Sequence, residues 1–173
     1  FSAEQIWDSW ITLRSFSIGA GLREIYEDHG KRVKLKPAAI YEIERGMAMS
    51  AFEIHKASEA RSAWFGKAVE LFETFDVLVL PSAQVFPFDV RLEHPLSVNG
   101  QEMDTYHRWM EVVIAASLIG LPVVNVPIGF GGASDLPMGV QLIGKRGSDA
   151  KLLQIANAWH QATQWPERRR PAL

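Results

Sequence analysis

The sequence contains no cysteine, so disulfide bonds and thiolate metal ligands are excluded. This absence is typical of proteins from a reducing compartment, and we expect a soluble protein in the cytoplasm. No apolar stretch reaches the roughly 18 residues that a membrane-spanning helix needs, and no secretory signal opens the chain. The formal net charge is only −2, which favours neither a nucleic-acid nor a membrane partner.

An initiator methionine is also missing, because the chain starts at Phe1 within a helical pattern. We therefore expect an N-terminally truncated portion of a longer protein. What is present is ordinary for a globular domain: 173 residues, 47% of them hydrophobic and 22% charged. The one basic run, residues 168–170, lies near the C-terminus and is more typical of a solvated tail than of a phosphate site.

Two long helical stretches precede the first strand pattern. Ser2 and Gln5 have the spacing of a capping box, and the helix that follows should end before Gly30. Pro37 suits the first position of a helix, and segment 35–75 has an apolar periodicity that predicts one long or broken helix. The helical stripe of the first helix comprises Ile6, Trp10, Leu13, Ser17 and Ala20.

Three segments have the pattern of strands. Segment 76–81, DVLVLP, is a continuous apolar run that ends at proline, which predicts a strand buried on both faces. Segments 123–128 and 138–143 follow, joined by residues 129–137. Together with the helices, they predict an α/β fold with a mixed β-sheet flanked by helices.

Capping residues mark two further helices. Asp104 is suited to the N-cap of a helix that ends at Gly120, and Ser148 to the N-cap of a last helix. In the segment 120–130, GLPVVNVPIGF, Pro122 can start a strand at a position where no backbone N–H is needed for strand pairing. Pro127 can end regular pairing. We therefore expect a short strand that a proline bounds at each end.

Several segments occur in the order and spacing of a known family. They are FDVLVLPSAQVFP, GLPVVNVPIGF, LPMGVQLIG, GSDAKLLQIANAWHQ and a closing WPERRRP. These segments resemble the C-terminal part of the amidase-signature hydrolases, from about Leu35 onward. The pair of strands with its turns is the most specific part of the resemblance.

This resemblance implies hydrolysis of carboxylic amides, without metal or cofactor, by a serine nucleophile, a second serine and a lysine base. The family places these groups before the region matched here, so none of them maps onto this sequence. We assign no catalytic residue and expect the isolated chain to be inactive. No metal site is predicted, because the spacing of His55 and Glu59 is more typical of a surface pair.

Three residues outside this pattern need separate interpretation. Ser134, in GGAS, lacks a second serine and is not expected to act as a nucleophile. Lys145 stands beside Arg146 at a predicted turn and is expected to be solvated. Ser82 follows the first strand, where α/β sheets place functional loops, and is expected to line a pocket.

The segment DTYHRWME contains the best candidates for substrate contact, because the resemblance places this stretch near the substrate. Tyr106, Trp109 and Glu111, with Ser82, are therefore the substrate-binding candidates. A purely structural role for Trp109 in the core stays open. The implied substrate is a small-molecule amide whose identity the sequence does not specify.

Two other functions also stay open: a non-enzymatic binding or assembly module, and part of an A-type amidotransferase subunit. We treat residues 1–173 as one portion of an amidase domain, with helical parts at 1–34 and 35–75 and an α/β part at 76–173. Strand edges that lack a partner readily pair with another chain, so we expect the isolated chain to form a homo-oligomer.

Overall fold

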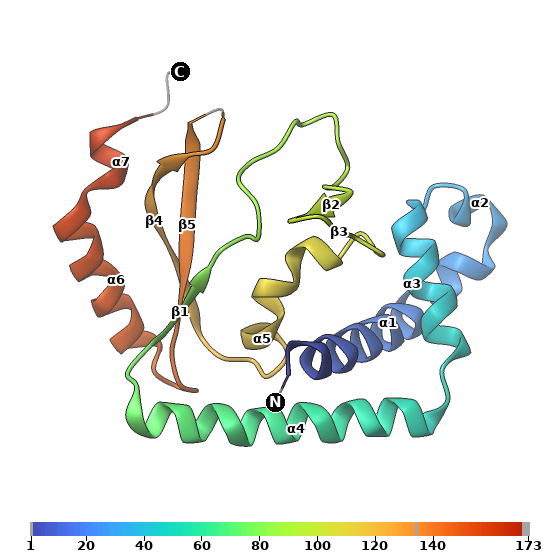
Figure 1. Cartoon of the computed structure of the whole chain (residues 1–173). Coiled ribbons are helices and arrows are strands. Elements are labelled where there is room, and N and C mark those ends of the chain that lie inside the picture. Colours follow the sequence, from blue (N-terminus) through green and yellow to red (C-terminus); the bar gives the residue numbers. More distant parts are fainter. Residues whose placement is uncertain (1, 134, 171–173) are drawn as a thin grey trace. The chain divides into compact units, whose positions relative to one another are not determined.

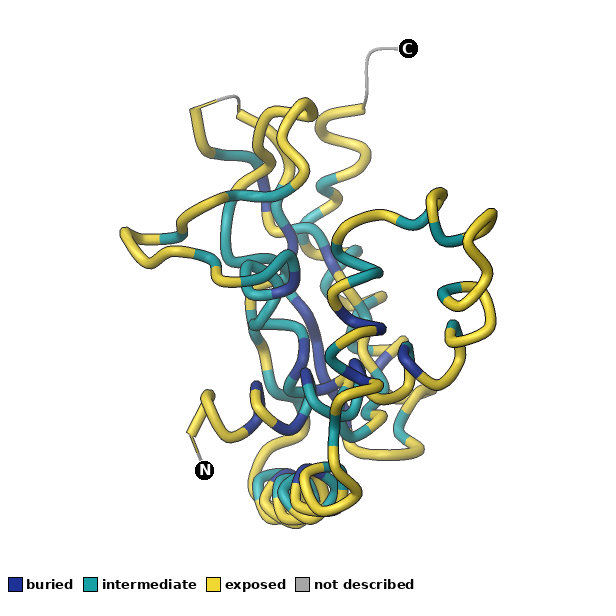
Figure 2. The backbone as a smooth tube through the Cα atoms, turned by 90° about the vertical axis from the view of Figure 1, so that its right-hand side faces the viewer, coloured by how far each residue is buried: buried dark blue, intermediate teal, exposed yellow. Residues whose placement is uncertain are grey.

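A computed structural model describes residues 2–133 and 135–170. The chain forms two compact units, Phe1–Gly66 (the helical unit) and Lys67–Leu173 (the sheet unit). Buried stretches are short and alternate with exposed ones along the backbone (Figure 2). The domain boundaries expected at residues 34 and 75 stay a prediction.

The helical unit begins as predicted. The Ser2 hydroxyl accepts a hydrogen bond from the Gln5 amide, and the Gln5 side chain accepts one from the Ser2 amide. Pro37 is the first residue of α3, and the second helical stretch is broken between Ala48 and Ala51. The helices are α1 (Ala3–Glu27), α2 (His29–Arg32), α3 (Pro37–Ala48) and α4 (Ala51–Thr74), of which α4 continues into the sheet unit.

Helices α1 and α3 approach each other closely at glycines. A Cβ atom on Gly46 would lie 2.0 Å from the Ser15 carbonyl oxygen, so no side chain fits there. The buried residues of α1 are Ile6, Trp7, Ser9, Ile11, Ser15 and Gly19. The helix that the sequence stripe predicted is present. Of that stripe only Ile6 is among the buried residues, and the buried face also contains the small residues Ser15 and Gly19, which permit close packing.

The sheet unit contains a three-stranded sheet in the order β1-β5-β4, in which β4 and β5 form a long hairpin (Figure 1). Its strands are β1 (Leu78–Pro81), β4 (Val123–Gly131) and β5 (Leu136–Ile143). The α/β class is confirmed. Both pairings are antiparallel, so the described residues do not contain the parallel pairing that a mixed sheet also requires.

Helix α6 (Asp149–Thr163) packs against the hairpin. The buried cluster between them comprises Val126, Leu142 and Leu152, surrounded by Val77, Val124, Val140, Ile155, Ala156 and Trp159. Burial on both faces of β1 was predicted wrongly, because Val79 is 57% exposed and burial alternates along the strand. The apolar run belongs to an edge strand with one face left open.

The segment from Asp104 to Gly120 is not one helix. It forms the 3₁₀ helix η1 (Arg108–Val113) and the short helix α5 (Ile114–Ser117), and Asp104 is not an N-cap. The Val112 amide donates to the Gln84 side chain at 3.1 Å. In a continuous α-helix this amide would instead donate to a carbonyl of the same helix. The end is as predicted, because Gly120 adopts a left-handed φ of 65°.

The remaining elements are short. Strands β2 (Ser97–Val98) and β3 (Gln101–Glu102) form a small hairpin around Asn99 and Gly100, which both have positive φ. Ser148 occupies the N-cap position of α6, but its hydroxyl donates to the Lys145 carbonyl rather than capping the helix. Helix α7 (Trp165–Arg168) ends the described chain.

Candidate functional site

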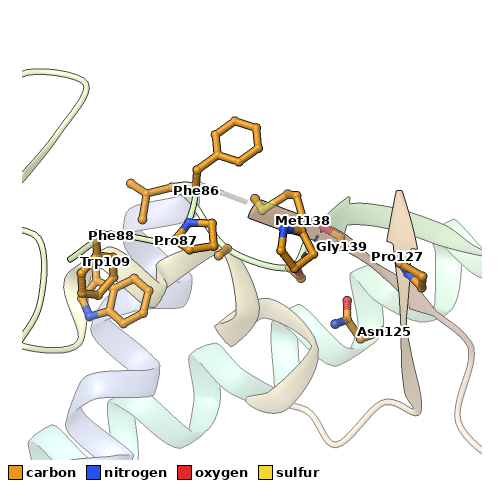
Figure 3. Close-up of a pocket in the computed structure, with 12 residues that line it drawn as sticks. Phe86, Pro87, Phe88, Trp109, Asn125, Pro127, Met138 and Gly139 are labelled. Carbon is orange, nitrogen blue, oxygen red and sulfur yellow. Dashed lines mark hydrogen bonds between the residues drawn. The ribbon is translucent and has the colours of Figure 1, made fainter. Parts of the chain in front are cut away.

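A pocket of about 440 Å³ lies inside the sheet unit, between the loop after β1 and the β4–β5 hairpin (Figure 3). It is lined by Ser82, Ala83, Val85, Phe86, Pro87, Phe88, Trp109, Asn125, Pro127, Pro137, Met138 and Gly139. Apart from the Trp109 indole, only Ser82 and Asn125 contribute polar side-chain atoms. An apolar pocket with few polar groups is the usual form of a small-molecule site.

Pro127 shapes one wall of this pocket through a β-bulge. The pairing register of β4 shifts between Pro127 and Gly129, and the Trp159 indole N–H donates to the Pro127 carbonyl at 2.8 Å. A bulge tolerates the missing amide of proline. The expectation that regular pairing ends at Pro127 was therefore wrong, since pairing resumes and the strand runs to Gly131.

The connection between β4 and β5 is also shorter than predicted. The strands end and begin at Gly131 and Leu136, so the turn is a tight hairpin rather than the segment 129–137. Ser134 falls between these two residues, outside the described part of the chain.

Ser82 lines the pocket, as expected for a residue that follows the first strand. Its amide donates to the Gly139 carbonyl at 3.0 Å, and its hydroxyl donates to the same carbonyl at 2.8 Å. A serine nucleophile instead needs its hydroxyl bonded to a base. This geometry agrees with the interpretation of Ser82 as a pocket residue rather than a nucleophile.

Two glutamines that the sequence reasoning missed hold the pocket together. The Gln141 side chain donates to the carbonyls of Pro81, at 2.7 Å, and Val112, at 3.3 Å. With the Gln84 bond to Val112, these contacts fix η1 against β1 and β5. A buried polar residue within an apolar strand, as in GVQLIG, is the sequence signal that could have revealed Gln141.

Trp109 lies at one end of the pocket, beside Phe88, while Asn125 and Pro127 lie at the other (Figure 3). The Phe88 and Trp109 rings pack edge to face, with centroids 5.4 Å apart. The structure thus brings together Ser82 and Trp109, two of the four predicted substrate-binding residues, in one pocket. Their roles in binding stay predictions.

Tyr106 and Glu111 do not line this pocket. The Tyr106 ring packs edge to face against His94 and His107, and the Glu111 carboxylate lies 3.3 Å from the Arg108 guanidinium. Both residues belong to the segment around η1, which also carries Trp109. Their assignment as substrate-binding residues also stays a prediction.

Other charged candidates lie at the surface. His55 and Glu59 form an exposed pair at 3.5 Å, as their spacing predicted. Within residues 2–133 and 135–170, no three side chains of metal-ligand type are grouped. No helix in the described chain is both long enough and apolar enough to span a membrane.

Comparison with known families shows which family this chain belongs to. The sequence profile of the family described as Amidase matches residues 7–153. The chain belongs to the amidase family. The resemblance to amidase-signature enzymes inferred from the sequence is thereby confirmed.

One curated relative of this amidase chain is the A-type subunit of the glutamyl-tRNA(Gln) amidotransferase of Synechococcus sp. (strain JA-2-3B'a(2-13)). It is 34% identical over 117 residues, which cover 67% of this chain and 21% of that protein. The chain therefore spans about a fifth of the length of the curated relatives it matches.

Solved structures share the fold. A bacterial aryl acylamidase of the amidase-signature family matches 96% of this chain and 35% of its own, with a TM-score of 0.82 and 22% identity. The A-type subunit of the Thermotoga maritima glutamyl-tRNA(Gln) amidotransferase matches 89% of this chain and 33% of its own, with a TM-score of 0.58 and 25% identity. The fold of this chain is thus that of amidase-signature enzymes.

Proposed function

We propose that this chain forms part of the substrate pocket of an amidase that hydrolyses the C–N bond of small carboxamides. Family membership supports the reaction class, and the pocket beside the hairpin supports the role in binding. The nucleophile and its base come from residues outside this chain. This proposal agrees with the Ser82 hydroxyl, whose proton is already donated to a backbone carbonyl.

The composition of the pocket carries the proposal. Phe86, Phe88, Trp109 and Met138 form apolar walls, and a volume of about 440 Å³ suits a small aryl or branched acyl group. Ser82 and Asn125 supply the polar atoms that could orient an amide. Tyr106 and Glu111, which do not line this pocket, remain further substrate-binding candidates on the segment around η1.

A second candidate is a subunit of an amidotransferase. The observation that favours it is the set of curated relatives, which are A-type subunits of glutamyl-tRNA(Gln) amidotransferases. A subunit of this kind would require a protein partner. Co-purification of a partner with the full-length protein, together with inactivity on free amides, distinguishes it from a self-sufficient amidase.

We also propose that the isolated chain is a homo-oligomer. Strands β1 and β4 each pair only with β5 among the described residues, so each leaves one edge open. A non-enzymatic module would share these edges but would not need the pocket. Because a binding module could also hold a ligand there, hydrolysis of amides by the full-length protein separates that alternative from the amidase proposal.

Replacement of Trp109 by alanine tests the pocket. In the full-length protein, Trp109→Ala should change the ratio of kcat/KM between small and bulky amides, because the indole and Phe88 form one end of the pocket. If Trp109 were only a core residue, its loss would cost about 3–5 kcal/mol of stability and leave selectivity unchanged. Thermal unfolding and kcat/KM for a size series of amides measure the two effects.

Trp165→Ala is the matched control. Trp165 packs against Phe130 near the tip of the hairpin and does not line this pocket. Its loss should lower stability without altering the order of substrate preference. Selectivity that changes equally in both variants would contradict the placement of substrate beside Trp109.

A further inference from the structure

A second pocket, of about 600 Å³, lies between the tip of the β4–β5 hairpin and α7. Its lining residues come from segments 127–137 and 165–170, and we call it the hairpin-tip pocket. It shares Pro127 and Pro137 with the pocket beside Trp109 and is otherwise lined by different residues. Its volume is within the usual range for a small-molecule site.

The walls of the hairpin-tip pocket are flat and apolar. The Trp165 and Phe130 rings pack edge to face, with centroids 6.2 Å apart. The indole lies directly on β4, because a Cβ atom on Gly129 would be only 3.4 Å from two of its ring carbons. Pro137 and Pro166 also line the pocket. Aromatic and proline rings offer flat surfaces against which the ring of a ligand can pack.

The lining carries an excess of positive charge. Within the described part of the chain, Arg169 and Arg170 line the pocket together with a single acidic residue, Asp135. The Arg169 guanidinium binds the Asp135 carboxylate and lies over the Phe130 ring, 4.2 Å from its centroid. Asp135 balances the charge of one arginine only. The charge of the other favours an anionic group on a ligand.

The basic run 168–170, which is more typical of a solvated tail, is held against the hairpin in the structure. Helix α7 contacts β4 (Figure 1). The Arg168 guanidinium lies over the Trp165 ring, 5.3 Å from its centroid, as Arg169 does over Phe130. The run therefore presents its guanidinium groups beside the aromatic walls.

We propose that the hairpin-tip pocket binds a flat aromatic carboxylate. The ring of the ligand packs against Trp165, and its carboxylate binds the Arg170 guanidinium, whose planar fork matches two carboxylate oxygens. A neutral ligand of the same shape gains the apolar contact without the charge-assisted hydrogen bonds. Binding here requires no hydrolysis and no ligand in the pocket beside Trp109, so it does not depend on the proposed amidase function.

Two probes with the same carbon skeleton test this site: cinnamate, which is an anion, and cinnamyl alcohol, which is neutral. NMR titration of the isotope-labelled chain follows the indole N–H signal of Trp165, which is assigned by its absence in Trp165→Phe. Cinnamate should shift this signal at a lower concentration than the alcohol does. Arg170→Gln should weaken cinnamate binding roughly three- to tenfold, because a charge-assisted contact at an exposed site is lost. Binding of the alcohol should not change.

Arg146→Gln is the matched control, because it removes the same charge at an exposed residue that does not line the pocket. It should leave cinnamate binding unchanged, and Arg170→Lys should give an intermediate affinity. Equal binding of the two probes, or equal cinnamate binding by the two glutamine variants, overturns the carboxylate assignment. A Trp165 signal that neither probe shifts overturns the site itself. The amidase proposal stands in each case, since this signal does not report on the pocket beside Trp109.

Discussion

At the scale of single residues, glycine carries two opposite roles in the helical unit. Gly46 in α3 lies against the backbone of α1, where a Cβ would stand 2.0 Å from the Ser15 carbonyl oxygen. Gly21 in α1 has no atom within 4 Å of its Cβ position. The same residue type is required at one site and costs helix stability at the other.

Gly46→Ala should destabilise the protein by about 2–3 kcal/mol, because the added methyl group forces the two helices apart. Chemical denaturation monitored by circular dichroism measures the free energy of unfolding. Gly21→Ala, the control, should instead raise it by about 0.5–1 kcal/mol, since alanine favours the helix and meets no neighbour. Two variants of equal stability would contradict the close approach of α1 and α3.

Residue-level prediction from the sequence succeeded where the rule is local. Ser2, Pro37 and Gly120 occupy their predicted positions, because capping and left-handed turns depend on neighbours within a few residues. Asp104 is not a cap, because the helix begins only at Arg108, where the Gln84 side chain binds the Val112 amide from a distant part of the chain. A side chain so far away in sequence leaves no periodic signal.

At the scale of elements, an exposed ion pair joins the start of β1 to α6. The Lys151 ammonium binds the carboxylate of Asp76, just before the strand. The hydrogen bond and charge of Lys151 lower the pKa of Asp76, with a smaller contribution from the charge of Lys145. Because the folded form binds this proton more weakly, the pair stabilises the fold above the ordinary pKa of aspartate. That contribution is lost as the pH falls through the lowered pKa.

Lys151→Gln should raise the pKa of Asp76 toward its ordinary value, because the substitution removes the charge of Lys151. An NMR titration of the Asp76 carboxyl carbon measures this directly. Lys67→Gln, which removes a lysine paired with Glu70, serves as the control and should leave Asp76 unchanged. An Asp76 pKa that stays depressed in Lys151→Gln would show that another group is responsible.

The strands show which element properties follow from the sequence. All three main strands were located, and their segments also identified the family, because apolar runs and prolines are local features. The antiparallel order β1-β5-β4 and the exposed face of β1 were missed. Both depend on which elements cover the sheet. In the pocket, Ser82 and Trp109 were anticipated, whereas Asn125 was hidden inside an ordinary strand pattern.

At the scale of the whole molecule, the open sheet edges favour self-association. Val79 on β1 is 57% exposed and Val123 on β4 is 40% exposed, so both edge strands present apolar side chains. Light scattering at several dilutions should give a mass above the 19.4 kDa of one chain. A charge on the edge, as in Val79→Lys, should shift the equilibrium toward monomer. A mass of 19.4 kDa at every concentration would contradict the prediction.

We also expect the isolated chain not to hydrolyse amides. The Ser82 hydroxyl is directed to a carbonyl, and the chain covers 35% of the aryl acylamidase whose fold it shares. Incubation with a panel of aliphatic and aryl amides, followed by detection of released amine, measures the activity. Turnover that survives purification and disappears in Ser82→Ala would overturn the assignment of Ser82 to the pocket wall alone.

The bulge in β4 affects the shape of the hairpin. Ile128 is the extra residue between the paired Pro127 and Gly129, and its side chain is 40% exposed. Gly139 and Met138 are consecutive in β5, whereas their partners Pro127 and Gly129 are two residues apart in β4. Deletion of Ile128 would therefore leave the partners of Gly129 and Phe130 unchanged and would remove the local bend and the stronger twist that a bulge gives a strand. Ile128 thus sets the curvature of the hairpin through an extra backbone unit rather than through its side chain.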